Sequence, residues 1–134
     1  MTAPRDHVPR LPHAAPFLLL DRVLELGERT GAFLKLVTAA DPCVGPDGVL
    51  PAAFLLEALA QGGGALLGAH DGPQAGYLAA VEDFHVHGEA RAGDALRIEV
   101  EIVRHFAGAV LLRGRILVGE ELRAEGRVTL ALPR

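Results

Sequence analysis

The sequence predicts an α+β fold in which one long helix is wrapped by a single antiparallel sheet of about six strands. One segment is rich in Ala and Leu and apolar on nearly every side, and segments that alternate apolar with charged residues lie on either side of it. The chain has 134 residues, of which 50% are apolar, and this suits one domain with one core. We expect residues 1–10 to form a flexible arm and residues 11–134 to form the domain.

Two strands are expected before the helix. The first covers residues 17–26, where a continuous apolar run gives way to alternation, and the second covers residues 32–38. Residues 27–30 between them read as a turn. A loop follows at residues 41–48, where Pro and Gly favour an irregular backbone.

The helix is predicted over residues 52–69, with Pro51 at its first position, where the missing N–H costs nothing. Its glycine triplet, Gly62–Gly64, costs on the order of 1 kcal/mol per residue relative to alanine in a helix interior. Either the helix frays there or a neighbour packs too closely for side chains, and we favour close packing. One sheet covers only one side of so apolar a helix, so we predict that a second subunit covers the rest.

Four strands are expected after the helix, at residues 76–86, 96–102, 109–118 and 122–130. In the second and fourth of these, apolar and charged residues alternate strictly, as in antiparallel strands with one buried face. Gly119-Glu120 fits a two-residue hairpin turn with glycine at its first position.

Composition and charge exclude several classes of protein. The formal net charge is −4 with no basic excess, so we expect no nucleic-acid partner. A single cysteine forms no internal disulfide, and no ligand spacing indicates a metal site, so we expect neither a metal nor another cofactor. The chain start has no apolar signal region, and the apolar stretch at residues 49–69 is interrupted by Glu57 and Gln61. We therefore expect a cytoplasmic protein without a membrane span.

Three motifs resemble the β-hydroxyacyl-acyl-carrier-protein dehydratases of fatty-acid synthesis. They are Leu-Pro-His-Ala-Ala-Pro-Phe-Leu-Leu-Leu-Asp-Arg-Val at residues 11–23, Leu-Glu-Ala-Leu-Ala-Gln at residues 56–61, and Arg-Ala-Gly-Asp-Ala-Leu at residues 91–96. The resemblance runs from about Leu11 to Leu132. It implies the hotdog fold, a dimer with a continuous sheet, and dehydration of a 3-hydroxyacyl thioester carried on acyl-carrier protein or CoA.

The chain departs from that family in the loop before the helix. There the family carries a catalytic histidine in a Gly-His-Phe-Pro-Gly-Asn-Pro stretch, whereas residues 41–51 of this chain contain no histidine. Counting back from Glu57 without gaps places Cys43 at the histidine position. The altered loop is similar to that of paired dehydratase-like subunits of the aryl-polyene type. The resemblance therefore implies either a homodimer or a heterodimer with a histidine-bearing relative that supplies the missing group.

Dehydration needs a base at C2, a group that helps the C3 hydroxyl leave, and stabilisation of charge on the thioester oxygen. Glu57 matches the family's helix carboxylate, and the alternative interpretation is an exposed or ion-paired glutamate in the subunit contact. Gln61, one turn further, either holds Glu57 or satisfies a buried backbone group. The N–H groups of Ala52 and Ala53 at the helix start are candidate substrate-binding groups.

The remaining candidates are weaker. His13 matches the Pro-His of the opening motif, although a structural role is the commoner one for such a residue. Cys43 would act as a base only with a depressed thiol pKa, and otherwise it is a small apolar filler. His85 and His87 share one face of a strand, and without a third ligand nearby they indicate surface placement rather than a metal site.

Three functions follow from these residues. The opening motif favours a dehydratase of fatty-acid or polyene synthesis. A hotdog acyl thioesterase that uses Glu57 on water or on the carbonyl is the second. The missing loop histidine keeps open a third, a non-catalytic subunit that binds an acyl chain or completes an assembly.

Overall fold

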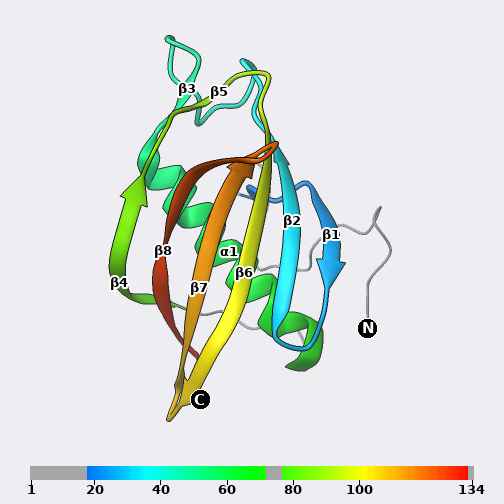
Figure 1. Cartoon of the computed structure of the whole chain (residues 1–134), viewed down its shortest axis with the longest axis vertical. Coiled ribbons are helices and arrows are strands. Elements are labelled where there is room, and N and C mark those ends of the chain that lie inside the picture. Colours follow the sequence, from blue (N-terminus) through cyan, green and yellow to red (C-terminus); the bar gives the residue numbers. More distant parts are fainter. Residues whose placement is uncertain (1–17, 72–76, 133–134) are drawn as a thin grey trace.

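One helix lies across one face of a six-stranded antiparallel sheet in the computed structural model, which describes residues 18–71 and 77–132 (Figure 1). The strand order in the sheet is β1-β2-β6-β7-β8-β4, so β1 and β4 are its edges. The elements are β1 (Arg22–Leu26), β2 (Thr30–Leu36), β3 (Val49–Leu50), α1 (Ala52–Asp71), β4 (Tyr77–Val86), β5 (Ala90–Arg91), β6 (Ala95–Phe106), β7 (Ala109–Val118) and β8 (Glu121–Ala131). The predicted fold class, strand number and hotdog arrangement are confirmed.

The first predicted strand starts too early. Leu18–Leu20 are not in a strand, and β1 begins at Arg22, whereas residue 17 and the expected arm at residues 1–10 lie outside the described residues. Leu19 and Leu20 are buried, and the Leu19 N–H donates to the side chain of Gln61 on the helix over 2.8 Å. This apolar run packs on the helix because its backbone hydrogen bond goes there instead of to a neighbouring strand.

A second, two-stranded sheet was not predicted. β3 pairs antiparallel with β5, joining Val49 to Arg91 and Leu50 to Ala90. Elements of two residues are too short to show alternation in the sequence. This small sheet lies beyond the start of α1, at the top of the view in Figure 1, and it holds the loop that leads into the helix.

Gly62 and Gly63 of the helix face the sheet, and the prediction of close packing is confirmed for these two residues of the triplet. A Cβ added at Gly62 would lie 3.2 Å from Val100, and one added at Gly63 would lie 3.1 Å from Leu112. A side chain at either position would require the neighbouring side chains of the sheet to shift. The helix therefore gives up some intrinsic helix propensity in exchange for closer packing.

The helical segment Ala52–Ala69 is long and apolar enough to cross a membrane, judged by length and composition alone, and its mean hydropathy is 1.3. Half of that window, 50%, is buried inside the domain, where α1 packs on β2, β6, β7 and β8. The segment thus serves as the core helix of the domain.

Part of the apolar surface remains uncovered along β4. Leu78, Val81 and Val86 pair with buried residues of β8, so their side chains face the helix side of the sheet, yet they are 40–44% exposed. The helix also contacts β4 and leaves a stripe of exposed or half-buried residues, namely Ala53, Leu56, Glu57 and Ala60. We call these seven residues the uncovered face.

Candidate active site

Glu57 is the one charged residue of the uncovered face, and a buried glutamine holds its side chain. Gln61 Nε2 donates to Glu57 Oε1 over 3.1 Å, and Gln61 Oε1 accepts from the Leu19 N–H over 2.8 Å. Gln61 is only 2% exposed. The structure therefore joins the two interpretations of Gln61, because its amide satisfies a buried backbone N–H and orients Glu57 at the same time.

The start of α1 offers donors close to this carboxylate in the sequence. Pro51 has no N–H, and its carbonyl accepts from Phe54 over 2.9 Å. Ala52 and Ala53 are exposed, and within residues 18–71 and 77–132 their N–H groups make no hydrogen bond. The first turn holds no acidic residue that would compete for these donors. Such a terminus favours negative charge on a bound ligand.

The loop at residues 41–48, which stands where the resembled dehydratases carry their catalytic histidine, is anchored by an ion pair. Lys35 Nζ lies 2.8 Å from Asp41 Oδ2, and the two side chains are only 5% and 12% exposed. The other carboxylate oxygen of Asp41 accepts from the Cys43 N–H over 3.0 Å. Burial disfavours the ionised carboxyl, but these hydrogen bonds and the charge of Lys35 outweigh it, so the pKa of Asp41 is below its usual value.

The same surroundings make Cys43 a poor base. Burial, together with the charge and hydrogen bonding of Asp41, raises the pKa of the Cys43 thiol above its usual value. A base needs the thiolate, which this site disfavours. Cys43 is half-buried and packs against the core, which favours the interpretation as an apolar filler.

The turn at residues 91–94, one of the three family-like motifs, fixes the loop from the other side. Gly93 has a positive φ of 101°, and its N–H donates to the Val37 carbonyl over 2.7 Å, while Val37 donates to Asp94 over 2.9 Å. The Ala92 N–H donates to the carbonyl of Gly48 over 2.8 Å. The loop is thereby tied at both ends, which sets where the helix begins.

The histidines that the structure describes do not converge on Glu57. His85 lies on the outer face of β4 and His87 follows directly after that strand. Their ring centroids are 6.3 Å apart, and His87 Nε2 lies 2.8 Å from Glu125 Oε2. Among the described residues no group of three metal-binding side chains occurs. His13 lies outside the described residues.

Sequence reasoning missed the pair of Lys35 and Asp41. The signal was present, because alternation in β2 places Lys35 on the same side as the fully buried Phe33. A lysine on the core side of a strand requires a counter-charge nearby, and Asp41 at the start of the loop provides it.

Comparison with known proteins identifies the family. The sequence matches the ApeP-like family, described as ApeP dehydratase, over residues 7–134. The chain belongs to this family.

Individual relatives agree with that assignment. The chain is 40% identical over 134 residues to the 3-hydroxyacyl-[acyl-carrier-protein] dehydratase FabZ of Variovorax paradoxus, covering 91% of this chain and 88% of the relative. It is 38% identical over 135 residues to FabZ of Thermus thermophilus, covering 96% and 95%. The chain is therefore a dehydratase-like member of the 3-hydroxyacyl-[acyl-carrier-protein] dehydratases.

Solved structures confirm the hotdog fold. The dehydratase heterocomplex ApeI:P from Xenorhabdus doucetiae superimposes with a TM-score of 0.89 at 23% identity, covering 96% of this chain and 93% of that one. A hypothetical thioesterase with coenzyme A from Streptococcus pneumoniae gives a TM-score of 0.69 at 13% identity, covering 82% and 86%. At these identities the likeness shows the fold and does not separate dehydratase from thioesterase.

Proposed function

We propose that this chain is one subunit of a (3R)-3-hydroxyacyl-[acyl-carrier-protein] dehydratase of fatty-acid or polyene synthesis, and that a second subunit supplies the base. The observation that carries the proposal is Glu57, which lies on the uncovered face of an apolar helix and is held there by the buried Gln61. A glutamate that serves only solubility needs no buried amide to orient it.

The site of one chain is incomplete. The loop at residues 41–48 has no histidine, and its cysteine is held as the thiol. The apolar residues of β4 and α1 around Glu57 need covering, and a second hotdog subunit placed on the β4 edge would bring its own loop toward this carboxylate. The ApeI:P heterocomplex, which shares this fold, supports a partner that is a related subunit.

The proposed reaction divides its roles between the subunits. A histidine of the second subunit takes the proton from C2, and negative charge develops on the thioester oxygen. The N–H groups of Ala52 and Ala53 stabilise that charge at the positive end of the helix. Glu57 delivers a proton to the C3 hydroxyl, which leaves as water when the C3–O bond breaks, and an enoyl thioester remains.

The substrate and location follow from the same proposal. We expect a 3-hydroxyacyl chain carried on acyl-carrier protein, as the names of the FabZ relatives state for those enzymes, or on CoA. We also expect this chain to work in the cytoplasm.

The test measures dehydration of a 3-hydroxyacyl carrier-protein thioester by this chain alone, by a histidine-bearing dehydratase-like subunit from the same source, and by their mixture. Each measurement is repeated with Glu57→Gln. We expect the mixture to form enoyl product at least roughly 10²-fold faster than this chain alone, the scale of a general base. We expect Glu57→Gln to abolish that gain.

The other outcomes identify the other functions. Turnover by this chain alone at ordinary dehydratase rates would refute the proposal that a second subunit supplies the base. The base would then have to be sought in this chain, at Cys43 or His13. Release of free thiol from a simple acyl thioester would indicate the thioesterase. An active mixture that Glu57→Gln leaves unchanged would show that this chain is a non-catalytic subunit, an interpretation that the missing histidine also favours.

A further inference from the structure

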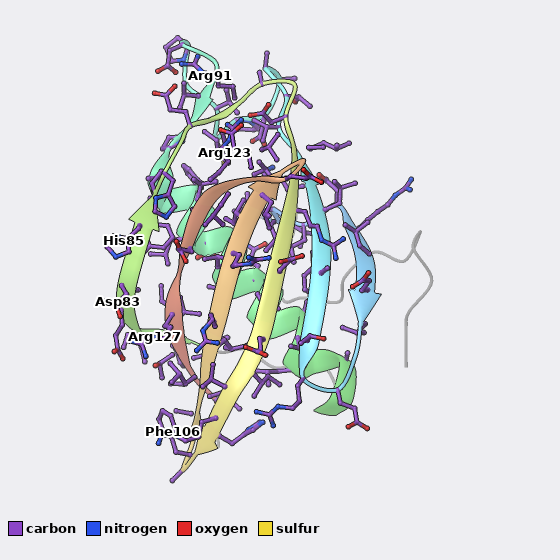
Figure 2. The ribbon with its side chains drawn as sticks, viewed as in Figure 1. Asp83, His85, Arg91, Phe106, Arg123 and Arg127 are labelled. Atoms are coloured by element: carbon purple, nitrogen blue, oxygen red, sulfur yellow. The ribbon has the colours of Figure 1, made fainter. Side chains whose placement is uncertain are left out.

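The outer side of β4 carries two adjacent carboxylates that share one arginine. Arg127 on β8 lies 2.6 Å from Asp83 and 3.6 Å from Glu82. Figure 2 shows Asp83 and Arg127 close together at the edge of the sheet, with His85 further along the same strand. One guanidinium thus faces two carboxylates, while the next cations along the outer face, Arg113 and Arg115, are paired with Glu101 and Glu99 instead.

A bulge places both carboxylates on that side. Asp83 has a positive φ of 53°, in the left-handed region, and the register between β4 and β8 shifts between Glu82 and His85. The bulge turns Phe84 inward, where its backbone approaches Gly126 so closely that an added Cβ would lie 2.9 Å from the Phe84 Cα. Asp83 and Glu82 are thereby fixed next to each other on an unpaired edge strand.

The periodicity of β4 determines which residues lie opposite each other when the β4 strands of two copies pair. Partners on β8 show that Leu78, Val81 and Val86 face inward, as does Phe84 at the bulge, whereas Glu82 faces outward. In an antiparallel self-pairing, residues opposite each other share a face. The register between β4 and β8 also shifts between Leu78 and Ala80. With the two-fold axis at Glu82, and with Ala79 and Asp83 left out as bulge residues, Val81 meets Phe84 and Leu78 meets Val86.

This register overlaps residues 77 to 87, one residue past the end of β4, and matches apolar with apolar at the inward positions. Its outward pairs bring Ala80 to His85 and Tyr77 to His87. Shifting the axis to Val81 or Phe84 also preserves the faces but shortens the overlap. At the favoured axis, however, Glu82 lies opposite Glu82 of the second copy. The two copies bring four carboxylates and two guanidinium groups to that point. Like charges directly opposite one another destabilise a strand pair.

We propose that Glu82 and Asp83 select the partner subunit, weakening self-pairing and favouring a hotdog subunit with Lys or Arg at the centre of its edge strand. The inference rests on the proposed function, because it concerns the second subunit that completes the Glu57 site. The apolar inner residues contribute affinity for the edge strand of any hotdog subunit. The charges at the centre of β4 contribute specificity for one partner over another.

The test uses this chain as its own probe, so that no partner needs to be identified. Wild type is mixed with equal amounts of Glu82→Lys carrying a mass tag, and dimers are counted by native mass spectrometry. We expect mixed dimers to exceed the statistical half and to reach about three-quarters of the total, because the introduced ammonium then faces the glutamate of a wild-type copy. A statistical mixture would overturn the proposal.

A second variant keeps the test independent of how well Glu82→Lys folds. We expect Glu82→Gln to tighten self-association about three- to tenfold in sedimentation equilibrium at low salt, with thermal melts confirming the fold. The matched control is Glu101→Gln on β6, which removes another outward glutamate paired with an arginine, Arg113 at 3.3 Å, away from the edge. Equal effects from the two variants would overturn the proposal.

Association is measured here without turnover, so the two proposals fail separately. If mixed dimers dominate but no pairing of subunits gives enoyl product, the dehydratase proposal is wrong and the pairing rule holds. If product forms while mixing stays statistical, the pairing rule is wrong and the dehydratase proposal holds.

Discussion

Gln61 Nε2 donates a hydrogen bond to Glu57 Oε1 over 3.1 Å, one turn back along the same helix. A second hydrogen bond of Gln61, to Leu19, fixes which end of the amide faces Glu57. The Leu19 N–H can only donate, so it must meet the amide oxygen of Gln61, and the NH₂ group then points to Glu57. A backbone group of the segment before β1 thus sets how the candidate catalytic carboxylate is oriented.

Gln61→Leu should therefore lower kcat more than it raises KM. The change leaves the Leu19 N–H buried without its acceptor, so we expect a loss of roughly 1–3 kcal/mol in unfolding free energy. The informative measurement is a double-mutant cycle on the active assembly. If Gln61 acts through Glu57, then adding Gln61→Leu to Glu57→Gln costs no further activity. A fully additive loss would show that Gln61 supports only the fold.

Much of the fold was predictable because its signals are long. The strands β6 and β8 and the apolar helix each extend over 11 residues or more, with alternation in residues 96–102 and 122–130, and β7 was predicted at its observed bounds, Ala109–Val118. The errors in the predicted strands lie where tertiary contacts override the local pattern of apolar residues. Leu18–Leu20 resemble a strand, yet Leu19 gives its N–H to a helix side chain 42 positions away, which no local window contains.

The candidate site was predictable only in part. Glu57 is recognisable because a carboxylate stands out in an apolar helix, and Gln61 follows from helical spacing. Lys35 and Asp41 form their pair across a strand end, and Glu82 and Asp83 acquire their shared face from a bulge. The alternation of β2 does place Lys35 on the core side, but it does not identify Asp41 as the partner. The shared face of Glu82 and Asp83 has no sequence period at all and is seen only in the folded backbone.

Asp41→Asn should destabilise the domain at neutral pH. It leaves the ammonium of Lys35 buried without its counter-charge, which costs about 3 kcal/mol for a buried pair. Chemical unfolding at pH 7 would measure the loss. Lys35→Met combined with Asp41→Asn should recover most of it, because no charge then remains buried. A double variant as unstable as the single one would show that the carboxylate is needed for the loop rather than for the lysine.

The same carboxyl group makes stability depend on acidity. The folded-state pKa of Asp41 is lowered, so its contribution is complete above the unfolded value of about 3.9 and is lost as the pH falls through the folded value. Unfolding free energy should fall from pH 5 to pH 3, less steeply in Asp41→Asn. Burial opposes ionisation of Glu99, but hydrogen bonds from Arg97 and Arg115 outweigh it, so the pKa of Glu99 is also lowered and accounts for part of the remaining slope. Identical slopes in the two proteins would contradict the assignment to Asp41.

Leu59→Asp should prevent folding. Leu59 is fully buried, and its side chain packs so closely on β7 that a Cβ added at Gly114 would lie 2.6 Å from it. A carboxylate there would be buried without a partner. Leu36→Asp is the matched control, since Leu36 is 49% exposed on β2 and the same change should leave the far-ultraviolet circular dichroism spectrum intact. A folded Leu59→Asp variant would show that the helix does not pack as described.

Val81→Asp should separate association from folding. Val81 is 41% exposed on the inner side of the edge strand β4, so the isolated domain tolerates a charge there. At the subunit contact that we propose, the same carboxylate would be buried against an apolar partner strand. We expect wild type to sediment at micromolar concentration mainly as a dimer, and Val81→Asp to sediment as a folded 14.1 kDa monomer. Thr129→Ala on the outer side of neighbouring β8 should leave the dimer unchanged. A Val81→Asp dimer as tight as wild type would place the subunit contact somewhere other than β4, and a wild-type chain that is monodisperse at 14.1 kDa would refute the predicted homodimer.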